Sequence, residues 1–142
     1  MRIQAAIATA AILTFAAGAA NADAQKYDAN LTGAAEVPAA TTPARGVITT
    51  LFDTDNGELS YTVTFSGLSG PVTGADFHGP AGRTAQAPVT YAAAGTASPI
   101  SGTIKLTTQH SRDLNAGVWY FNIETAANPN GEIRGQLRRD DY

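Results

Sequence analysis

Asp76 and His78 stand two residues apart in the chain, and on a β-strand this spacing puts both side chains on one face. Asn122 and Glu124 repeat the same spacing in a later strand-like run. If the two strands are neighbours, these four side chains and Arg134 could meet on one polar face. The candidate polar cluster consists of Asp76, His78, Asn122, Glu124, Glu132 and Arg134.

The cluster contains the donor types of a metal site. One imidazole nitrogen from His78 with carboxylates from Asp76 and Glu124 forms a mixed set of the kind that binds a divalent metal such as zinc, copper, manganese or iron. The second histidine of the chain, His110, could join if its loop folds over the cluster. Metal binding is therefore one hypothesis for this cluster.

A structural role for the same residues is the hypothesis that the sequence favours. Arg134 could form bidentate salt bridges with Asp76 or Glu124, and Glu132 could serve the same purpose. An arginine inside a cation site would also repel the metal, by several kcal/mol at about 4 Å. In this interpretation the cluster holds no cofactor and braces the fold.

Catalysis by these residues is not indicated. On one strand the Cα atoms of Asp76 and His78 lie about 6.5 Å apart, which is a poor geometry for a base and its orienting carboxylate. No nucleophile-elbow motif is present. We therefore assign no catalytic residue and expect a non-catalytic protein, with weak enzymatic activity kept only for the metal-binding alternative.

The elements that must position the cluster are strands. Short runs with period-two alternation lie between frequent Gly and Pro residues, and no window after residue 25 shows the apolar periodicity of a helix of ordinary length. The pattern predicts an all-β fold, an antiparallel Greek-key β-sandwich or flattened barrel of about eight strands. The predicted strands are 27–33, 46–53, 58–66, 74–78, 89–93, 101–108, 118–125 and 132–138.

The final two predicted strands form a hairpin with a distinct core face. Trp119, Phe121 and Ile123 alternate with polar residues and are expected in the core. The turn at 128–131, Asn-Pro-Asn-Gly, contains residues that favour tight reversals. A second turn at 53–57 ends in Asn-Gly, and its carboxylates are better explained by a plain hairpin than by a calcium loop.

The first 24 residues predict a cleaved signal peptide. Arg2 precedes an apolar run from Ala5 to Ala17, and small residues then form two adjacent cleavage sites that end at Ala22 and Ala24. The run is shorter than the roughly 20 residues of a membrane span. We therefore expect an exported protein, periplasmic or extracellular, with a single domain over residues 25–142 and no membrane span after cleavage.

The amino-acid composition excludes several kinds of chemistry and of binding partner. The chain of 142 residues has no cysteine, which excludes disulfides and thiol chemistry. Its formal net charge is −3, and no basic stripe is available for nucleic acid. Two histidines are too few for a copper-zinc superoxide dismutase centre, which needs about half a dozen.

Several motifs resemble the chordin-type domain, CHRD. Members close with Gly-Glu-Ile-Arg-Gly-Gln, and this chain has that run at 131–136. In this chain Asp76 stands where members usually have the first histidine of a His-x-His-Gly-Pro-Ala segment, and Glu124 stands where they have the histidine before Thr125. The other matching positions are Leu31-Thr32-Gly33, Glu36-Val37-Pro38, His78-Gly79-Pro80-Ala81, Leu114, Ala116-Gly117, Tyr120 and Asn122.

CHRD domains occur in extracellular antagonists of growth-factor signalling and in exported bacterial proteins. The resemblance to them implies a superoxide-dismutase-like shape, whereas the two histidines of this chain are too few for that enzyme's activity. It also implies a binding or structural module of the cell envelope or extracellular space, whose partner is a protein or a surface. The alternative is an exported divalent-metal-binding protein that uses Asp76, His78 and Glu124.

Overall fold

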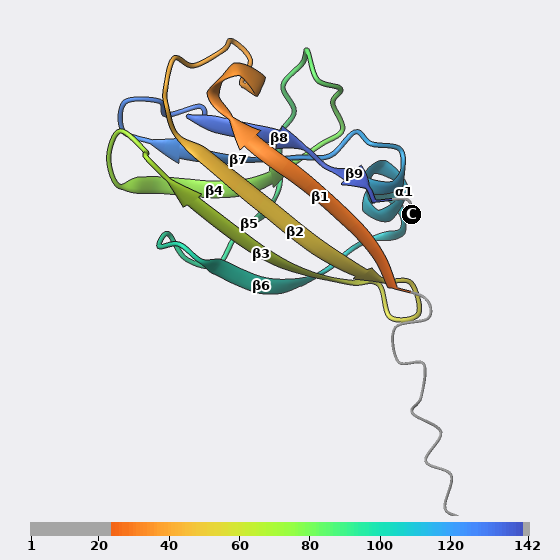
Figure 1. The fold of residues 1–142 in the computed structure, drawn as a ribbon. Helices are drawn as coiled ribbons and strands as arrows, with labels where there is room; N and C mark the ends of the chain where they lie inside the picture. Colours follow the sequence, from red (N-terminus) through yellow and green to blue (C-terminus); the bar gives the residue numbers. More distant parts are fainter. Residues whose placement is uncertain (1–23, 141–142) are drawn as a thin grey trace, which may run out of the picture.

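Strands dominate the described part of the chain, residues 24–140, in this computed structural model (Figure 1). The predicted signal peptide, residues 1–24, lies outside the described residues except for Ala24, which begins the first strand. The strands are β1 (Ala24–Thr32), β2 (Arg45–Asp53), β3 (Glu58–Ser66), β4 (Val72–His78), β5 (Val89–Ala92), β6 (Ile100–Lys105), β7 (Tyr120–Thr125), β8 (Ile133–Gln136) and β9 (Arg138–Arg139), and the helices are the 3-10 turn η1 (Gly33–Ala35) and α1 (Thr108–Asn115).

One antiparallel sheet contains all the strands. Its order is β5-β4-β7-β8-β1-β2-β3-β6, and the short β9 pairs with β1 beside β8. The long strands β1, β2 and β3 cross one side of the molecule, whereas β4, β7 and β8 lie behind them, so that the sheet curves into a nearly closed barrel (Figure 1). The prediction of an all-β flattened barrel is confirmed.

The core lies inside this barrel. Alternate residues of each long strand point inward, as Leu59, Tyr61 and Val63 do in β3, and are buried. The aromatic rings of Phe77, Trp119 and Phe121 pack against one another, with Phe77 and Phe121 4.9 Å apart between ring centroids. The predicted core positions of the final hairpin are therefore confirmed.

The helix α1 is a difference from the sequence prediction. The predicted strand 101–108 ends at Lys105, and the chain then turns into a helix whose first turn is capped by the Thr107 hydroxyl, which accepts from the backbone N–H of His110. The helix has eight residues and buries only Leu114. Two turns with one buried residue are too short to show a helical period in the sequence.

Both predicted turns join adjacent strands. Asp53 Oδ1 accepts from the backbone N–H of Asp55 at 2.9 Å, and Gly57 has a φ of +74°, so residues 53–57 form the β2–β3 hairpin. Gly131 has a φ of +130° in the β7–β8 turn. The plain-turn interpretation of residues 53–57 agrees with this geometry.

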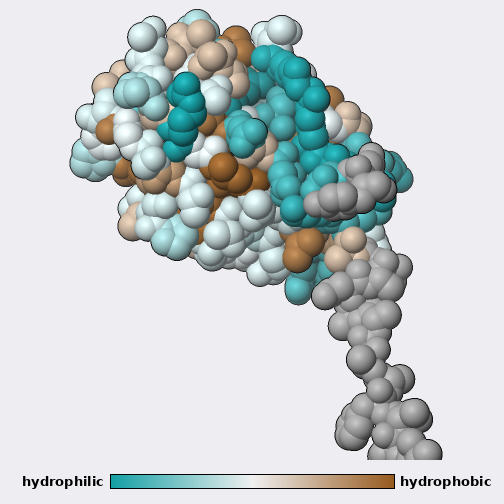
Figure 2. All heavy atoms as spheres, viewed as in Figure 1, coloured by the Kyte–Doolittle hydropathy of each residue, from teal (hydrophilic) through white to brown (hydrophobic). Residues whose placement is uncertain are grey.

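The outer surface is mostly polar on the face that Figure 2 shows. Strongly hydrophilic residues gather over the 79–88 loop and β9, and a smaller apolar area lies beside them (Figure 2). Within residues 24–140, no helix has the length and apolar character needed to cross a membrane.

Candidate functional site

Neighbouring strands bring the two halves of the candidate cluster together. β4 and β7 are antiparallel, with Asp76 opposite Asn122 and Gly74 opposite Glu124. Because Phe77 points into the core, Asp76 and His78 take the outer face. The register thus joins residues that lie more than 40 positions apart in the chain.

Three potential ligand groups converge on this face. One donor atom from each of Asp76, His78 and Glu124 lies within 4.8 Å of the others, and His78 Nε2 lies 4.0 Å from Glu124 Oε1. Burial, followed by the hydrogen bond with Asp76 and the negative charge of Asp76, raises the pKa of Glu124 to about 7. The Glu124 carboxyl group therefore keeps its proton to a higher pH than an ordinary glutamate does.

Two oxygen atoms hold the His78 ring. Its Nδ1 lies 2.9 Å from the carbonyl oxygen of Ala87, and its Nε2 lies 2.9 Å from Asn122 Oδ1. The Asn122 amide is oriented by its own Nδ2, which donates to the Asn130 carbonyl at 3.0 Å. The ring also stacks on Tyr120 with centroids 4.8 Å apart. His78 thus links the outer face of the sheet to the loop 79–88.

Arg134 lies near His78 and Glu124, but its contacts differ from the predicted ones. The guanidinium donates to the carbonyls of Ala85 at 2.9 Å and Gly82 at 3.0 Å, and its carbon lies 3.4 Å from the Tyr120 ring centroid. It forms no ion pair within 4.0 Å with a carboxylate of residues 24–140. The predicted salt bridges to Asp76 or Glu124 are therefore replaced by bonds that brace the 79–88 loop.

Burial is also the largest influence on the pKa of Arg134. Removal from water lowers the pKa of the guanidinium, while Tyr120 and the Glu36 carboxyl oppose that change. The side chain is 2% exposed and ranks among the largest fully buried ones. A guanidinium at this depth depends on its carbonyl partners.

Glu132 lies in a different environment from the rest of the predicted cluster. Glu132 immediately precedes β8, and its carboxylate accepts several hydrogen bonds from neighbouring loops and strands. We call this hydrogen-bond network the Glu132 cap. Burial would raise its pKa, but the bonds from Ser69, Thr125 and Thr42 outweigh burial and lower it. The donors of the Glu132 cap are the Ser69 backbone and hydroxyl, Thr42, Thr125 and Asn128.

His110 does not approach the cluster. Its Nδ1 lies 3.0 Å from the Tyr91 hydroxyl, and its ring packs against Trp119 with centroids 5.5 Å apart. Trp119 belongs to the core, so His110 lies at the core-side end of α1. Among the described residues, the group of potential metal ligands contains His78 as its only histidine.

The sequence reasoning missed Glu36 as a site residue. It follows η1, is 7% exposed and reaches toward Asn122 and Gly131. Burial raises its pKa to about 7, against the lowering effects of Arg134 and a hydrogen bond from Asn122. No described residue bonds to its Oε1. Its only signal was its place in the Glu36-Val37-Pro38 motif, because a residue in a loop belongs to no alternating pattern.

Two hollows flank this region, and we name them by their positions. The cluster cavity, about 280 Å³, is lined by the ring of His78 and the side chains of Asn122, Glu124 and Glu36. The β1–β8 groove, about 810 Å³, lies beside it and includes Arg83, which no motif had indicated. Glu36 and Arg134 line both hollows.

Comparison with known proteins places the chain in a family. A sequence profile of the CHRD domain matches residues 27–137, which is most of the chain. The match runs from Tyr27 in β1 past the end of β8, and it includes every residue that lines the two hollows except Arg138. No curated protein and no solved structure matches the chain. The protein belongs to the CHRD domain family.

Proposed function

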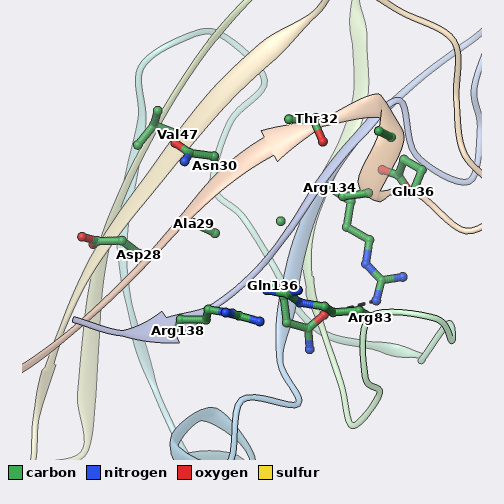
Figure 3. A pocket seen from close by; sticks show the side chains of 13 residues that line it. Asp28, Ala29, Asn30, Thr32, Glu36, Val47, Arg83, Arg134, Gln136 and Arg138 are labelled. Carbon is green, nitrogen blue, oxygen red and sulfur yellow. Dashed lines mark hydrogen bonds between the residues drawn. The ribbon is translucent and has the colours of Figure 1, made fainter. Parts of the chain in front are cut away.

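We propose that this chain is an exported, non-catalytic binding module that engages a protein or surface partner through the β1–β8 groove. A CHRD domain suggests a binding or structural module. The observation that carries the proposal is the groove itself, a hollow of about 810 Å³ on the outside of the barrel. Its walls come from β1, β8, β9 and the 79–88 loop (Figure 3).

Arginine side chains determine which partner the groove suits. Arg83 and Arg138 are exposed, and neither side chain forms a hydrogen bond or ion pair with another residue of the described chain. Figure 3 shows them on either side of Gln136, whereas Asp28 lies toward the far end of the groove. Asp28 is already paired with Lys26 at 3.1 Å. Free guanidinium groups favour carboxylates through paired hydrogen bonds, so the partner should present acidic groups.

Capture from the envelope and extracellular fractions of the source cells tests partner binding. We expect the unmodified protein to retain an acidic partner, and the double variant Arg83→Ala, Arg138→Ala to lose most of it. The matched control is Arg45→Ala, Arg112→Ala, which removes two exposed arginines from outside the groove. Equal capture by both double variants would contradict a role for the groove.

Export is the second part of the proposal, and it is supported by the charged start, apolar run and small-residue sites of residues 1–24. N-terminal sequencing of the protein from the periplasm or medium should find a chain that begins after Ala22 or Ala24. A chain retained in the cytoplasm with Met1 in place would contradict it. Divalent-metal binding, the other candidate function, would use the cluster cavity and is compatible with a partner in the groove.

A further inference from the structure

A set of potential metal donors lies at the wall of the cluster cavity, which His78 and Glu124 line, and the proposed binding function does not use it. His78, Asp76 and Glu124 offer one nitrogen and two carboxylate oxygens within 4.8 Å of one another. Ligands held about 2.1 Å from one ion at tetrahedral angles lie about 3.4 Å apart. The 4.0 Å between His78 Nε2 and Glu124 Oε1 is therefore wide by roughly half an ångström. Small side-chain rotations bring the three donors onto one ion.

The His78 ring is already oriented as a metal ligand would be. A metal-bound histidine usually donates its other ring N–H to a carbonyl or carboxylate, which fixes the ring and leaves one nitrogen lone pair for the metal. Ala87 supplies such a carbonyl at 2.9 Å from Nδ1. The hydroxyl of Tyr120 also donates to this carbonyl, at 3.2 Å. The imidazole is thus fixed from the loop side, with Nε2 directed into the cavity.

Oxygen atoms surround Nε2. Asn122 Oδ1 lies 2.9 Å away and Glu124 Oε1 lies 4.0 Å away. The Asn122 amide cannot turn its nitrogen toward the ring without losing its bond to the Asn130 carbonyl. A ring nitrogen that faces only oxygen atoms needs either a hydrogen of its own to donate or a metal ion between it and the oxygens. The Asn122 oxygen would have to move by only about 0.5 Å to reach the spacing of a fourth ligand on the same ion.

The charge of Glu36, which is not one of the three donors, also favours a metal ion in the cavity. Glu36 is 7% exposed, lines the cavity, and has an oxygen that no described residue bonds. A buried carboxylate without a full set of partners is costly unless a cation lies near. Arg134 lies near Glu36 but is directed at the loop carbonyls of Gly82 and Ala85. Once ionised, the Glu36 carboxylate would therefore favour a further positive charge in the cavity.

We propose that Asp76, His78 and Glu124 bind one divalent transition-metal ion in the cluster cavity. The imidazole selects for zinc and similar borderline metals over calcium and magnesium, which prefer sites made only of oxygen. Glu36 lies behind Asn122 and balances the charge without being a ligand. None of the three proposed ligands lines the β1–β8 groove, although Glu36 and Arg134 line both hollows.

Zinc titration of the purified, tag-free protein by calorimetry tests the proposal. We expect one zinc per chain, an affinity at least about tenfold weaker in Glu124→Gln and His78→Gln, and no competition from excess calcium. Glu58→Gln is the matched control, because Glu58 is an exposed glutamate outside the cavity. Absence of stoichiometric binding, equal affinity in Glu124→Gln and Glu58→Gln, or displacement by calcium would each overturn the proposal.

The two histidines provide a second readout that needs no variant. Zinc should shift the ring ¹⁵N resonance of His78 and leave that of His110 unchanged, since His110 is bonded to Tyr91 and packed on Trp119. This measurement keeps the proposal falsifiable if a substituted protein fails to fold. A shift at His110 alone, or at neither ring, would overturn it.

Discussion

Two buried glutamates of this protein, Glu132 and Glu36, differ in how many donors surround them. The Glu132 cap supplies bonds to both carboxylate oxygens, and these bonds hold the pKa of Glu132 below its usual value. Glu36 has one oxygen that no described residue bonds, and burial raises its pKa to about 7. Burial alone therefore does not set the charge of a carboxyl group; the supply of donors does.

The same comparison separates a structural region from a candidate functional one. The Glu132 cap closes one end of the barrel with a satisfied network, as expected of residues that stabilise a fold. The cluster cavity instead brings His78 and Glu124 within ligand distance of Asp76, beside a Glu36 oxygen that no described residue bonds. A ligand or ion would complete the second region, whereas the first is complete as it stands.

The largest expected effect comes from Glu132→Gln. The amide would place an N–H₂ group against donors that now bond a carboxylate, so we expect the free energy of unfolding to fall by about 4 kcal/mol. Urea denaturation measures this change. Glu58→Gln, on an exposed strand end, should stay within about 0.5 kcal/mol of the unmodified protein. A similarly small loss in Glu132→Gln would mean that the cap is solvated.

Arg134→Ala should have the second-largest effect and lower the free energy of unfolding by about 3 kcal/mol. The buried guanidinium donates to two loop carbonyls and stacks on Tyr120. Hydrogen exchange should show faster opening of the loop 79–88. Arg134→Lys should recover only part of the loss, since a lysine lacks the planar fork. A change below about 0.5 kcal/mol would show that Arg134 does not brace the loop.

The pH dependence of stability should have opposite signs for the two glutamates. Burial holds the pKa of Glu36 at about 7 in the folded protein, whereas the unfolded chain releases this proton near the ordinary glutamate pKa of 4.5. The folded state thus binds more protons between these values, and the Glu36 contribution to stability is lost as pH rises through 7. We expect Glu36→Gln to reduce the fall in stability from pH 5 to pH 8 by about 1 kcal/mol, with allowance for solvent screening.

The contribution of Glu132 to stability should have the opposite pH dependence and be lost in acid. Its lowered pKa means that the contribution is present above pH 4.5 and is lost as pH falls through the folded value. Thermal melts of the unmodified protein, Glu36→Gln and Glu132→Gln between pH 3 and 8 separate the two groups. If Glu36→Gln left the pH 5 to 8 slope unchanged, Glu36 would not be the group that titrates there.

Gly74→Ala should have the smallest effect on stability among these variants. It tests whether Glu124, in the cluster cavity, is a zinc ligand. Gly74 lies opposite Glu124 in the sheet, and a Cβ there would displace the Glu124 carboxylate. We expect a change below about 1 kcal/mol in unfolding free energy but several-fold weaker zinc binding. A matched substitution, Gly70→Ala, meets no atom within 4 Å and should leave zinc binding unchanged. Equal zinc affinity in both variants would count against Glu124 as a ligand.

Several features of the fold follow directly from local sequence patterns. Alternation in the segment 58–66 identified β3 and its buried face, and the turn residues at 53–57 and 128–131 located two hairpins. The helix α1 was missed because its two turns bury a single residue, Leu114. Local patterns therefore predicted strands well and a short capped helix poorly.

The candidate site was predicted in part. The two-residue spacing of Asp76 and His78 was enough to place both on one face, and the pairing of β4 with β7 brings Glu124 beside them. The spacing of Glu132 from Arg134 was misleading, because Glu132 precedes the start of β8 and points to the barrel end. Glu36 and Arg83 lie in loops, where no alternation links a residue to a face.

By itself, the sequence determined the strands, their buried faces, the hairpin turns and the absence of disulfides, because these depend on neighbouring residues or on composition. Only the tertiary structure decided which strands pair, and thus that His78 faces Asn122 and that Arg134 bonds the loop carbonyls in place of a carboxylate. The physical reason is that register, burial and the supply of hydrogen-bond donors arise from contacts between segments far apart in the chain.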